Sequence, residues 1–351
     1  MTAAVNPGAR LTAPVHPINA AALARWLRAN VDAGIGDLVV EQYQGGQSNP
    51  TYRITTSDRR YVLRRKPPGK LLPSAHAVDR EFRVMSALAG TGVPVAKMHA
   101  LCEDEALIGT AFYVMEYIEG RILWDPTLPG MTPALRAAHY DELNRVIATL
   151  HQLDPVSIGL ADFGRTGNYI ERQVARWSKQ YEAAGAERIE AMDRLIEWLP
   201  SHIPEGDETR IVHGDYRLDN VIFHPAEPRI LAVLDWELST LGHPLSDFAY
   251  QVMAWRLGPQ EFRGLKGADL AALGIPDESE YVATYCRRTG RAGIANWEFY
   301  LIFNMFRIAA ILHGVLSRAL QGNAASDNAV EMGRRALPVA GIAWSMAQKL
   351  A

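Results

Sequence analysis

Cysteine is scarce in this chain, and a net charge of either sign is nearly absent. Only two cysteines, Cys102 and Cys286, occur in 351 residues, so a disulfide-stabilised secreted scaffold is not expected. The formal net charge is −3, which argues against a general binder of nucleic acids or membrane surfaces. We therefore expect free thiols in a reducing compartment, with no nucleic-acid partner and no membrane partner.

Long uninterrupted apolar segments are also missing. The first dozen residues are rich in Ala, Pro, Gly and Thr and lack the apolar core of a signal peptide, which favours a cytoplasmic location. The most apolar stretch, residues 300–316, is interrupted by Asn304, Arg307 and His313. This pattern favours a buried helix over a membrane span.

The chain does have the length and the apolar residues for a sizeable core. Hydrophobic residues make up 48% of the sequence, and 351 residues suit two lobes or domains better than one small core. No internal repeat and no low-complexity run occurs. Residues 1–16 contain Pro7 and Pro14 and are predicted to form a disordered tail.

The most informative stretch begins with an apolar strand at residues 211–212 and continues into the motif HGDYRLDN. This motif contains a carboxylate, Asp215, and an amide, Asn220, and a later strand over residues 229–234 delivers a second carboxylate, Asp235. Two carboxylates and an amide oxygen can hold Mg²⁺ together with phosphate oxygens, and one carboxylate can accept the proton of a substrate hydroxyl. The pattern therefore predicts phosphoryl transfer. The alternative interpretation is that His213 and Asp215 only fix a turn and that Asn220 is a turn-forming residue.

These residues, with the LDWE motif at 234–237 and the GHPLSD motif at 242–247, resemble the aminoglycoside phosphotransferase-like family of small-molecule kinases. Residues 213–250 are most similar to the kinase-like domains that are fused to some acyl-CoA dehydrogenases. The resemblance covers nearly the whole chain. It implies an α+β, protein-kinase-like two-lobe fold, with a small antiparallel-sheet N-lobe over 17–117 and a mainly helical C-lobe over 118–351.

The resemblance also implies roles for the residues of the motif. Asp215 would be the catalytic carboxylate, and Asn220 and Asp235 would bind Mg²⁺. Asp247 would be a buried structural carboxylate that accepts backbone N–H groups of the catalytic loop. His213 would pack that loop and would not act as a base.

A glycine turn between two predicted strands is a candidate phosphate-binding loop. Gly45 and Gly46 would let backbone N–H groups approach the phosphates of a nucleotide. Ser48 and Asn49 could add hydrogen-bond donors. A plain hairpin turn is the alternative interpretation of this motif on its own.

The strand that follows offers a basic side chain for the nucleotide. Side chains alternate along a strand, so Val62, Arg64 and Lys66 share one face. By resemblance, Val62 would lie over the adenine and Arg64 would hold the α- and β-phosphates, where most kinases have lysine. Lys66 is the alternative phosphate contact. Glu81, on a predicted helix over 76–88, would pair with Arg64, unless it is a solvated surface carboxylate.

Residues 112–120 are predicted to form a buried strand that runs into the linker between the lobes. By resemblance this is the hinge, where the backbone of Glu116 and Ile118 would bind adenine and Met115 would line its pocket. A simple core strand is compatible with that role. Most of the remaining chain is predicted to be helical, with two helices at 169–181 and 188–198 that would cover the substrate.

The leading hypothesis is an ATP- and Mg²⁺-dependent kinase that acts on a hydroxyl of a small molecule. A metal-dependent phosphohydrolase with His213, Asp215 and Asp235 as ligands is an alternative, but it leaves Arg64 and Glu81 unexplained. A nucleotide-binding pseudokinase is another alternative. Protein-kinase activity is not expected, because the short link over 237–244 leaves no room for a long activation loop.

The acceptor is the least defined part of the hypothesis. From residue 282 onward, eight basic residues face three acidic ones. The basic residues are Arg287, Arg288, Arg291, Arg307, Arg318, Arg334, Arg335 and Lys349. This bias disfavours polycations such as aminoglycosides, and the resemblance favours an anionic hydroxyacyl compound or its CoA ester. A solvated basic face, choline-type or sugar-type acceptors, GTP in place of ATP, any oligomeric state and a dehydrogenase partner all stay open.

Overall fold

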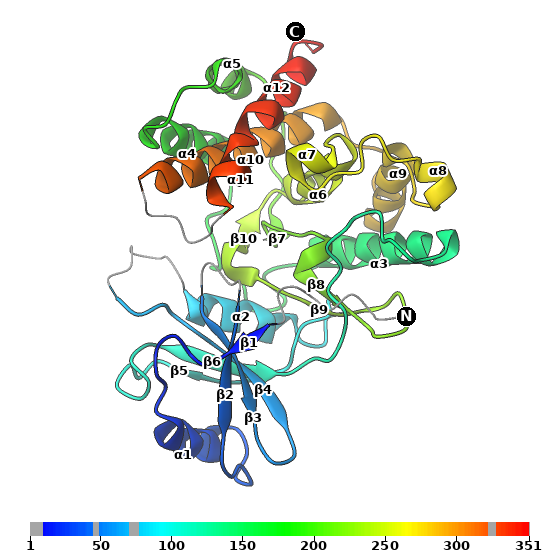
Figure 1. Cartoon of the computed structure of the whole chain (residues 1–351). Coiled ribbons are helices and arrows are strands. Elements are labelled where there is room, and N and C mark those ends of the chain that lie inside the picture. The colour runs from blue at the N-terminus through cyan, green and yellow to red at the C-terminus, as the bar shows by residue number, and fades with distance from the viewer. Residues whose placement is uncertain (1–9, 45–48, 70–76, 322–327, 351) are drawn as a thin grey trace. The chain divides into compact units, whose positions relative to one another are not determined.

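The computed structural model describes residues 10–44, 49–69, 77–321 and 328–350 (Figure 1). Contacts divide the chain into two compact units: Met1–Leu123 with Asp219–Ser239, and Trp124–Leu218 with Thr240–Ala351. We call them the sheet unit and the helical unit. The sequence predicts a single boundary near residue 118, whereas the structure groups Asp219–Ser239 with the sheet unit.

The sheet unit is built on one six-stranded antiparallel sheet with the strand order β1-β2-β3-β4-β6-β5. Its elements are β1 (Leu11–Thr12), α1 (Ala20–Asn30), β2 (Val39–Tyr43), β3 (Thr51–Thr55), β4 (Arg60–Arg65), α2 (Val78–Leu88), β5 (Met98–Cys102), β6 (Phe112–Glu116), β8 (Val221–Phe223), β9 (Ile230–Val233) and η4 (Trp236–Leu238). The predicted disordered tail over residues 1–16 extends too far, because Leu11 and Thr12 form a strand that pairs with β2. Residues 1–9 lie outside the described part of the chain.

Alternation along β4 separates the core of the sheet from its functional face. Tyr61 and Leu63 are buried in a cluster with Leu23 and Leu27, which lie one turn apart on α1. Asn19 caps the start of that helix, because its side chain accepts the Ala22 N–H at 3.0 Å. The side chains between these core positions, including Arg64, are therefore directed to the opposite face.

The β8–β9 hairpin belongs to the sheet unit through backbone hydrogen bonds. Arg121 and Phe223 exchange both N–H···O=C bonds at 2.8 Å, and the Val233 N–H donates to the Pro94 carbonyl at 2.9 Å. These bonds connect the hairpin to the segments that flank β5 and β6. Residues that follow β9 are consequently part of the same body as β4 and α2.

The helical unit contains most of the helices, as the resemblance implies. Its elements are α3 (Pro133–Gln152), α4 (Tyr169–Ala183), α5 (Glu190–Trp198), η2 (Leu199–Ser201), β7 (Arg210–Val212), β10 (Thr240–Gly242), α6 (Pro244–Val252), η5 (Met253–Trp255), α7 (Pro259–Phe262), α8 (Leu270–Leu273), α9 (Glu278–Thr289), α10 (Trp297–Leu320), α11 (Ala329–Arg334) and α12 (Ala336–Ala347). The turn η3 (Leu218–Asn220) joins the two units in sequence. An antiparallel sheet unit and a helical unit confirm the predicted α+β class.

Helix α10 is the centre of the helical unit. It packs against α4, α6, α11 and α12, and Figure 1 shows α11 and α12 alongside it. By length and composition α10 could cross a membrane, yet 78% of its most apolar window is buried within the fold. The helix therefore fits the predicted buried core helix.

The last helical segment, residues 329–347, is divided into two helices. The structure has two helices, α11 and α12, with Arg335 between them. Pro338 lies in the first turn of α12, where a missing N–H removes no helical hydrogen bond. In one continuous helix the same proline would remove the bond to the carbonyl of Arg334, so the break is the less costly solution.

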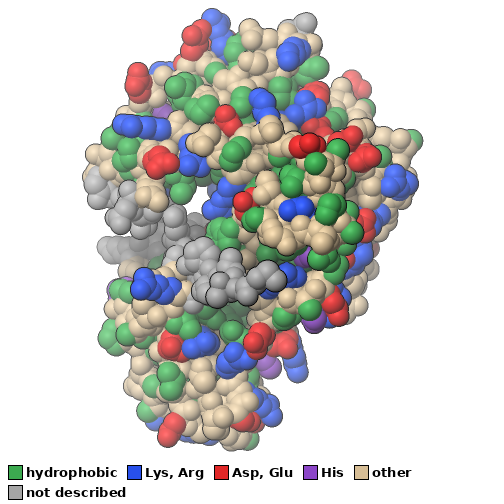
Figure 2. All heavy atoms as spheres, turned by 45° about the vertical axis from the view of Figure 1, so that its right-hand side comes forward, with side chains coloured by type: hydrophobic (Ala, Val, Ile, Leu, Met, Phe, Trp, Pro, Cys, Tyr) green, Lys and Arg blue, Asp and Glu red, His purple; other side chains and the backbone are tan. Residues whose placement is uncertain are grey.

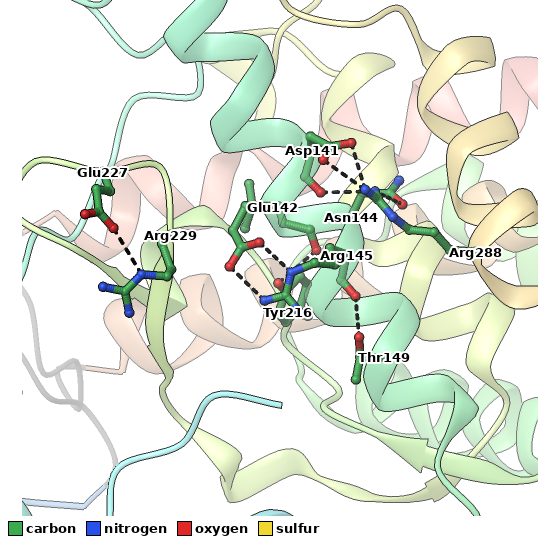
Figure 3. A network of polar contacts seen from close by, with 10 residues as sticks. Asp141, Glu142, Asn144, Arg145, Thr149, Tyr216, Glu227, Arg229 and Arg288 are labelled. Carbon is green, nitrogen blue, oxygen red and sulfur yellow. Dashed lines mark hydrogen bonds and ion pairs between the residues drawn. The ribbon is translucent and has the colours of Figure 1, made fainter. Parts of the chain in front are cut away.

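Polar contacts tie α3 to α9 (Figure 3). Arg288 on α9 donates to both carboxylate oxygens of Asp141 at 2.9 Å and to the side chain of Asn144 at 3.0 Å. Asn144 also donates to the Tyr281 carbonyl at 2.9 Å. Arg288 is thus one of the basic residues whose charge is already paired within the fold.

On the face drawn in Figure 2, acidic and basic side chains are interspersed.

Candidate active site

Four charged side chains meet at the end of β4 in the sheet unit. Arg64 Nε lies 3.2 Å from Glu81 Oε2 on α2, and Arg64 Nη2 lies 2.8 Å from Asp235 Oδ1 and 3.4 Å from Glu237 Oε2. The ion pair between Arg64 and Glu81 that the resemblance implies is therefore present. One cation among three carboxylates leaves an excess of two negative charges. Because Glu81 is buried and already bound, only Asp235 and Glu237 of this cluster could contribute oxygens to a divalent cation.

The Glu81 carboxylate is held from several sides. Its side chain is 1% exposed, and its oxygens accept hydrogen bonds from Tyr113 Oη at 2.9 Å and Asn49 Nδ2 at 2.6 Å. Asn49 was expected to donate to phosphates, but it is buried and its side-chain nitrogen supports Glu81 instead. Burial raises the pKa of Glu81, and the charge of Arg64 acts against that shift.

Arg64 keeps its charge in this setting. Burial alone would lower the pKa of its guanidinium, but Glu81, Tyr113 and Asp235 together hold that pKa above its ordinary value. The side chain is 14% exposed, so the guanidinium is largely shielded from solvent next to its carboxylates. The structure thus gathers the carboxylates around Arg64, which is the first of the two basic residues considered on this strand.

The two predicted metal ligands lie at the same end of the β8–β9 hairpin. The ladder pairs Val221 with Val233, and the Leu234 N–H donates to the Asn220 carbonyl at 2.8 Å. Asp235 adopts a left-handed backbone (φ +64°), a conformation that costs energy in a non-glycine residue and often marks functional sites. Its side chain is 34% exposed, which leaves the carboxylate accessible to a cation.

The donor set fits Mg²⁺ and does not fit a closed transition-metal site. Mg²⁺ is usually held by one or two carboxylates, with phosphates and waters completing an octahedron. Within the described ranges, no group of three or more His, Cys, Asp and Glu side chains could hold a metal ion. His213 Nδ1 accepts the backbone N–H of Asp215 at 3.1 Å, so that nitrogen is not available as a ligand. One of the two ring nitrogens that the phosphohydrolase hypothesis would use as a ligand is therefore occupied by a hydrogen bond.

The predicted adenine-binding residues occupy neighbouring strands. Val62 on β4 pairs with Met115 on β6, and both are buried. The Glu116 N–H donates to the Lys97 carbonyl at 2.9 Å, which leaves the Glu116 carbonyl as its candidate adenine contact. The N–H of Ile118 has no partner among the residues that the structure describes. The remaining predicted positions, Gly45, Gly46 and Ser48, lie outside the described residues.

The catalytic loop in the helical unit is held by its backbone. Asp247, near the start of α6, is 3% exposed and accepts the N–H of His213 at 2.7 Å and that of Gly214 at 2.8 Å. These are the contacts that the resemblance implies. Gly214 has φ +83°, a conformation that favours glycine. His151 Nε2 lies 3.2 Å from the same carboxylate, and hydrogen bonding to His151 holds the pKa of Asp247 below its ordinary value against the opposing effect of burial.

Three residues that the sequence analysis did not assign contact the catalytic loop. Tyr250 donates its hydroxyl to Asp215 Oδ1, and Arg217 Nε lies 3.4 Å from the same oxygen. Arg307 on α10 donates to the Gly214 carbonyl. Burial raises the pKa of Tyr250, and Asp215 adds to that shift, so Tyr250 stays a hydrogen-bond donor at neutral pH.

A sequence signal existed for Tyr250 and for Glu237, whose contact with Arg64 is likewise not predicted from the sequence. Tyr250 follows Asp247 by three positions and therefore lies on the same face of a helix. Glu237 follows Asp235 within the LDWE motif and joins the carboxylates around Arg64. Arg307 comes from a helix 93 residues beyond Gly214 in the chain, and no local pattern points to that contact.

A buried histidine next to this loop gives a testable pH dependence. His243 is 6% exposed, stacks on Tyr300 with ring centroids 5.3 Å apart, and its Nδ1 has no hydrogen-bond partner. Burial lowers its pKa to about 4, while Glu208 and Asp207 act in the opposite direction and Arg291 and His151 act in the same direction. The unfolded chain, with an ordinary pKa of about 6.5, binds this proton first as the pH falls.

The His243 contribution to stability is therefore complete above about pH 6.5 and is lost towards pH 4. Between pH 7 and pH 4.5 it should lower the free energy of unfolding by about 2–3 kcal/mol. His243→Phe keeps a stacked ring and cannot titrate, so its loss over the same range should be smaller by that amount. Urea denaturation of both proteins at the two pH values measures the difference. Equal losses would mean that His243 titrates normally in the folded protein.

Three comparisons relate this geometry to known proteins. The model of the phosphotransferase enzyme family matches residues 39–298. Acyl-CoA dehydrogenase family member 10 of Mus musculus is 51% identical over 317 residues, which are 90% of this chain and 30% of that protein. Acyl-CoA dehydrogenase family member 11 of Homo sapiens is 44% identical over 90% of this chain and 41% of its own length. The chain thus spans less than half the length of these relatives.

Solved structures share the fold. The crystal structure of a candidate aminoglycoside phosphotransferase from Ralstonia eutropha JMP134 is 55% identical, with a TM-score of 0.88 over 95% of this chain and 99% of that one. Spectinomycin phosphotransferase in complex with ADP and spectinomycin is 14% identical, with a TM-score of 0.64 over 95% of this chain and 100% of that one, and shows a likeness of fold alone. These matches confirm the protein-kinase-like two-lobe class.

Proposed function

From the premise that this chain belongs to the phosphotransferase enzyme family and transfers phosphoryl groups to an alcohol acceptor, we propose a specific reaction. The donor is ATP, assisted by Mg²⁺, and the acceptor is a hydroxyl of a small anionic molecule. A hydroxyacyl compound or its CoA ester is the first acceptor to test. Support for this choice comes from the 51% identity to acyl-CoA dehydrogenase family member 10 of Mus musculus.

The ion pair between Arg64 and Glu81, with Asp235 at 2.8 Å, carries the proposal. Kinase-type phosphoryl transfer requires a basic residue of the sheet paired with a helix carboxylate, next to a carboxylate for the metal ion. All three parts occur in one unit of this chain. A nucleotide-binding pseudokinase would not need to retain all of them together with Asp215.

Each unit would have a separate task. In the sheet unit, Val62 and Met115 would hold the adenine, Arg64 would contact the phosphates, and Asn220 and Asp235 would hold Mg²⁺. When bound, Mg²⁺ would neutralise charge on the transferring phosphoryl group. In the helical unit, Asp215 would orient the acceptor hydroxyl and accept its proton, because Tyr250 fixes the carboxylate and Asp247 fixes the loop.

The charge argument for the acceptor needs a correction. Part of the basic excess after residue 282 is not a free electrostatic surface, since Arg288 pairs with Asp141 and Arg291 with Glu208, two carboxylates outside the counted segment, and Arg335 pairs with Glu331 inside it. The counted charge therefore gives weaker support to an anionic acceptor than the sequence suggests. Arg307 is different, because it contacts the catalytic loop itself. The preference for an anion rests on that residue and its surroundings.

Release of ADP tests the reaction. Purified protein is incubated with ATP or GTP, with and without EDTA, and with hydroxyl compounds of anionic, neutral and cationic type. We expect ADP release that depends on Mg²⁺ and rises with an anionic hydroxyl acceptor. A phosphohydrolase would instead release phosphate without an acceptor, and a pseudokinase would bind nucleotide without turnover.

Asp235→Ala should weaken binding of Mg·ATP by at least about 10-fold, because the variant loses a charged contact to the metal ion, of the order of a charged hydrogen bond. Calorimetry with a non-hydrolysable ATP analogue and Mg²⁺ measures the change. Glu103→Ala removes an exposed carboxylate from the same unit and should leave the affinity unchanged. Equal affinities of wild type and Asp235→Ala would remove Asp235 from the metal site.

A further inference from the structure

A buried guanidinium lies next to the catalytic carboxylate in the helical unit. Arg307 is 6% exposed, and its guanidinium carbon lies 5.1 Å from the ring centroid of Tyr250, the residue that binds Asp215. Its Nε has no hydrogen-bond partner, and no carboxylate of the described ranges forms an ion pair with it. A buried charge without a counter-charge is costly, so its retention calls for a functional explanation.

A second arginine lies against the same aromatic surface. The ring centroid of Trp177 on α4 is 5.7 Å from the guanidinium carbon of Arg307 and 5.3 Å from that of Arg176. The two guanidinium carbons are therefore no more than about 11 Å apart. Two like charges at that range repel one another, and an anion between or beside them would relieve the repulsion.

The pKa of Tyr169 is affected by several positive charges near Arg307 and Arg176. Its ring packs directly on β10, because a Cβ atom at Gly242 would lie only 2.8 Å from Tyr169 Cε2. Burial raises the pKa of Tyr169, and of the four charged groups that act on it only Asp247 adds to that rise, whereas Arg307, Arg176 and Arg172 oppose it. Residues 169, 172 and 176 have the spacing of one helix face, so these charges gather on one side of α4.

We propose that Arg307 and Arg176, which both lie against the Trp177 ring, form together with Tyr169 an acceptor subsite that binds an anionic group next to Asp215. The inference rests on the proposed function and names the feature that selects its acceptor. A guanidinium binds carboxylate and phosphate oxygens with forked geometry, and the Trp177 ring offers an apolar surface to the carbon chain of the acceptor. Polycationic acceptors are disfavoured by the same charges.

The anionic group can come from two sources: the carboxylate of a free hydroxy acid or the phosphates of a CoA thioester. Matched probes separate them: 3-hydroxybutyrate, its primary amide 3-hydroxybutyramide, and 3-hydroxybutyryl-CoA. The first two have the same size and the same hydroxyl and differ in one charge. Binding is measured by calorimetry in the presence of Mg²⁺ and a non-hydrolysable ATP analogue, and turnover by ADP release with ATP.

Arg176→Gln is the principal variant, since Arg176 is exposed and does not contact the catalytic loop. It should reduce the wild-type preference for an anionic probe over the amide by about 10-fold, the order expected for loss of a charged hydrogen bond. Arg307→Lys keeps a charge but loses the fork, and should reduce the preference while Mg·ATP affinity is retained. Lys179→Gln removes one exposed positive charge from the same helix and should leave the preference unchanged.

The outcomes separate this inference from the proposed function. Wild-type protein that shows no preference for either anionic probe over the amide overturns the subsite, and so does a preference that Arg176→Gln leaves intact. Preference for the free carboxylate or for the thioester identifies the source of the anion. A preference in binding without ADP release from any probe would support the subsite and count against the proposed phosphoryl transfer to these hydroxyls.

Discussion

Asp215→Asn should lower kcat by about 10²–10⁴-fold while the fold and the affinity for Mg·ATP stay close to wild type. That range is the usual contribution of a positioned acid–base group. Asparagine has nearly the same shape as aspartate, and the loop is held independently of this side chain through Asp247 and Arg307. The substitution alters only the side chain of residue 215, which accepts the proton of the acceptor hydroxyl and the hydrogen bond from Tyr250.

Steady-state kinetics with the best acceptor from the panel, together with calorimetry for the nucleotide, measures both parts of this expectation. Glu182→Gln, a carboxylate-to-amide change at an exposed position of α4, is the matched control and should keep wild-type turnover. An Asp215→Asn enzyme that turns over within a few-fold of wild type would show that another group takes the proton. A large loss of Mg·ATP affinity would instead show that the side chain also supports the metal site.

Arg64→Ala should lower the stability of the sheet unit substantially. It leaves the buried carboxylate of Glu81, and the neighbouring Asp235 and Glu237, without their cation. Removing one partner of a buried pair costs about 3–5 kcal/mol in the free energy of unfolding. Because Arg64 is partly exposed at its outer end, the lower part of that range is expected.

Arg64→Lys should be milder and more informative. Lysine keeps the charge but cannot contact Glu81 and Asp235 with one planar fork, so ATP should bind more weakly by about 1–3 kcal/mol. Arg60→Lys, in an exposed pair with Glu119, is the matched control and should change little. In a double-mutant cycle, Arg64→Ala and Glu81→Ala should couple and not add, because the two residues share one ion pair.

Denaturant unfolding and calorimetry on the single and double variants give the coupling energy. Additive effects at 64 and 81, with the larger loss of ATP affinity at Lys66→Ala, would mean that Lys66 is the phosphate contact. That result would leave the family assignment intact and would move the nucleotide phosphates one alternate position further along the strand.

Sequence reasoning was most successful where the chemistry follows from local pattern or from the family motif. Alternation on β4 placed Arg64 opposite the core face, and the resemblance supplied both its partner Glu81 and the role of Asp247. Those contacts depend on positions that a motif fixes in order along the chain. Cytoplasmic location, ATP and Mg²⁺ dependence and the acceptor stay predictions.

The failures share a physical cause. Asn49 follows a glycine turn and is predicted to donate to phosphates, but two residues before β3 its side chain points inward to Glu81, a direction that only the packed sheet defines. Arg307 reaches the catalytic loop through the crossing of α10 over α6, which no periodicity encodes. The grouping of Asp219–Ser239 with the sheet likewise depends on backbone bonds to residues more than 100 positions earlier.

The discontinuous sheet unit has a practical consequence for dissecting this protein. The unit consists of Met1–Leu123 and Asp219–Ser239, with 95 residues of the helical unit between them in sequence. A fragment that ends at Leu123 would contain Arg64 and Glu81 without Asp235 or Glu237. It would also expose the backbone groups that Phe223 and Val233 normally occupy. Such a fragment would therefore be expected not to bind nucleotide, because these carboxylates are missing. Only a circularly permuted chain, or a fragment to which the β8–β9 hairpin is tethered, could test nucleotide binding by the sheet unit in isolation.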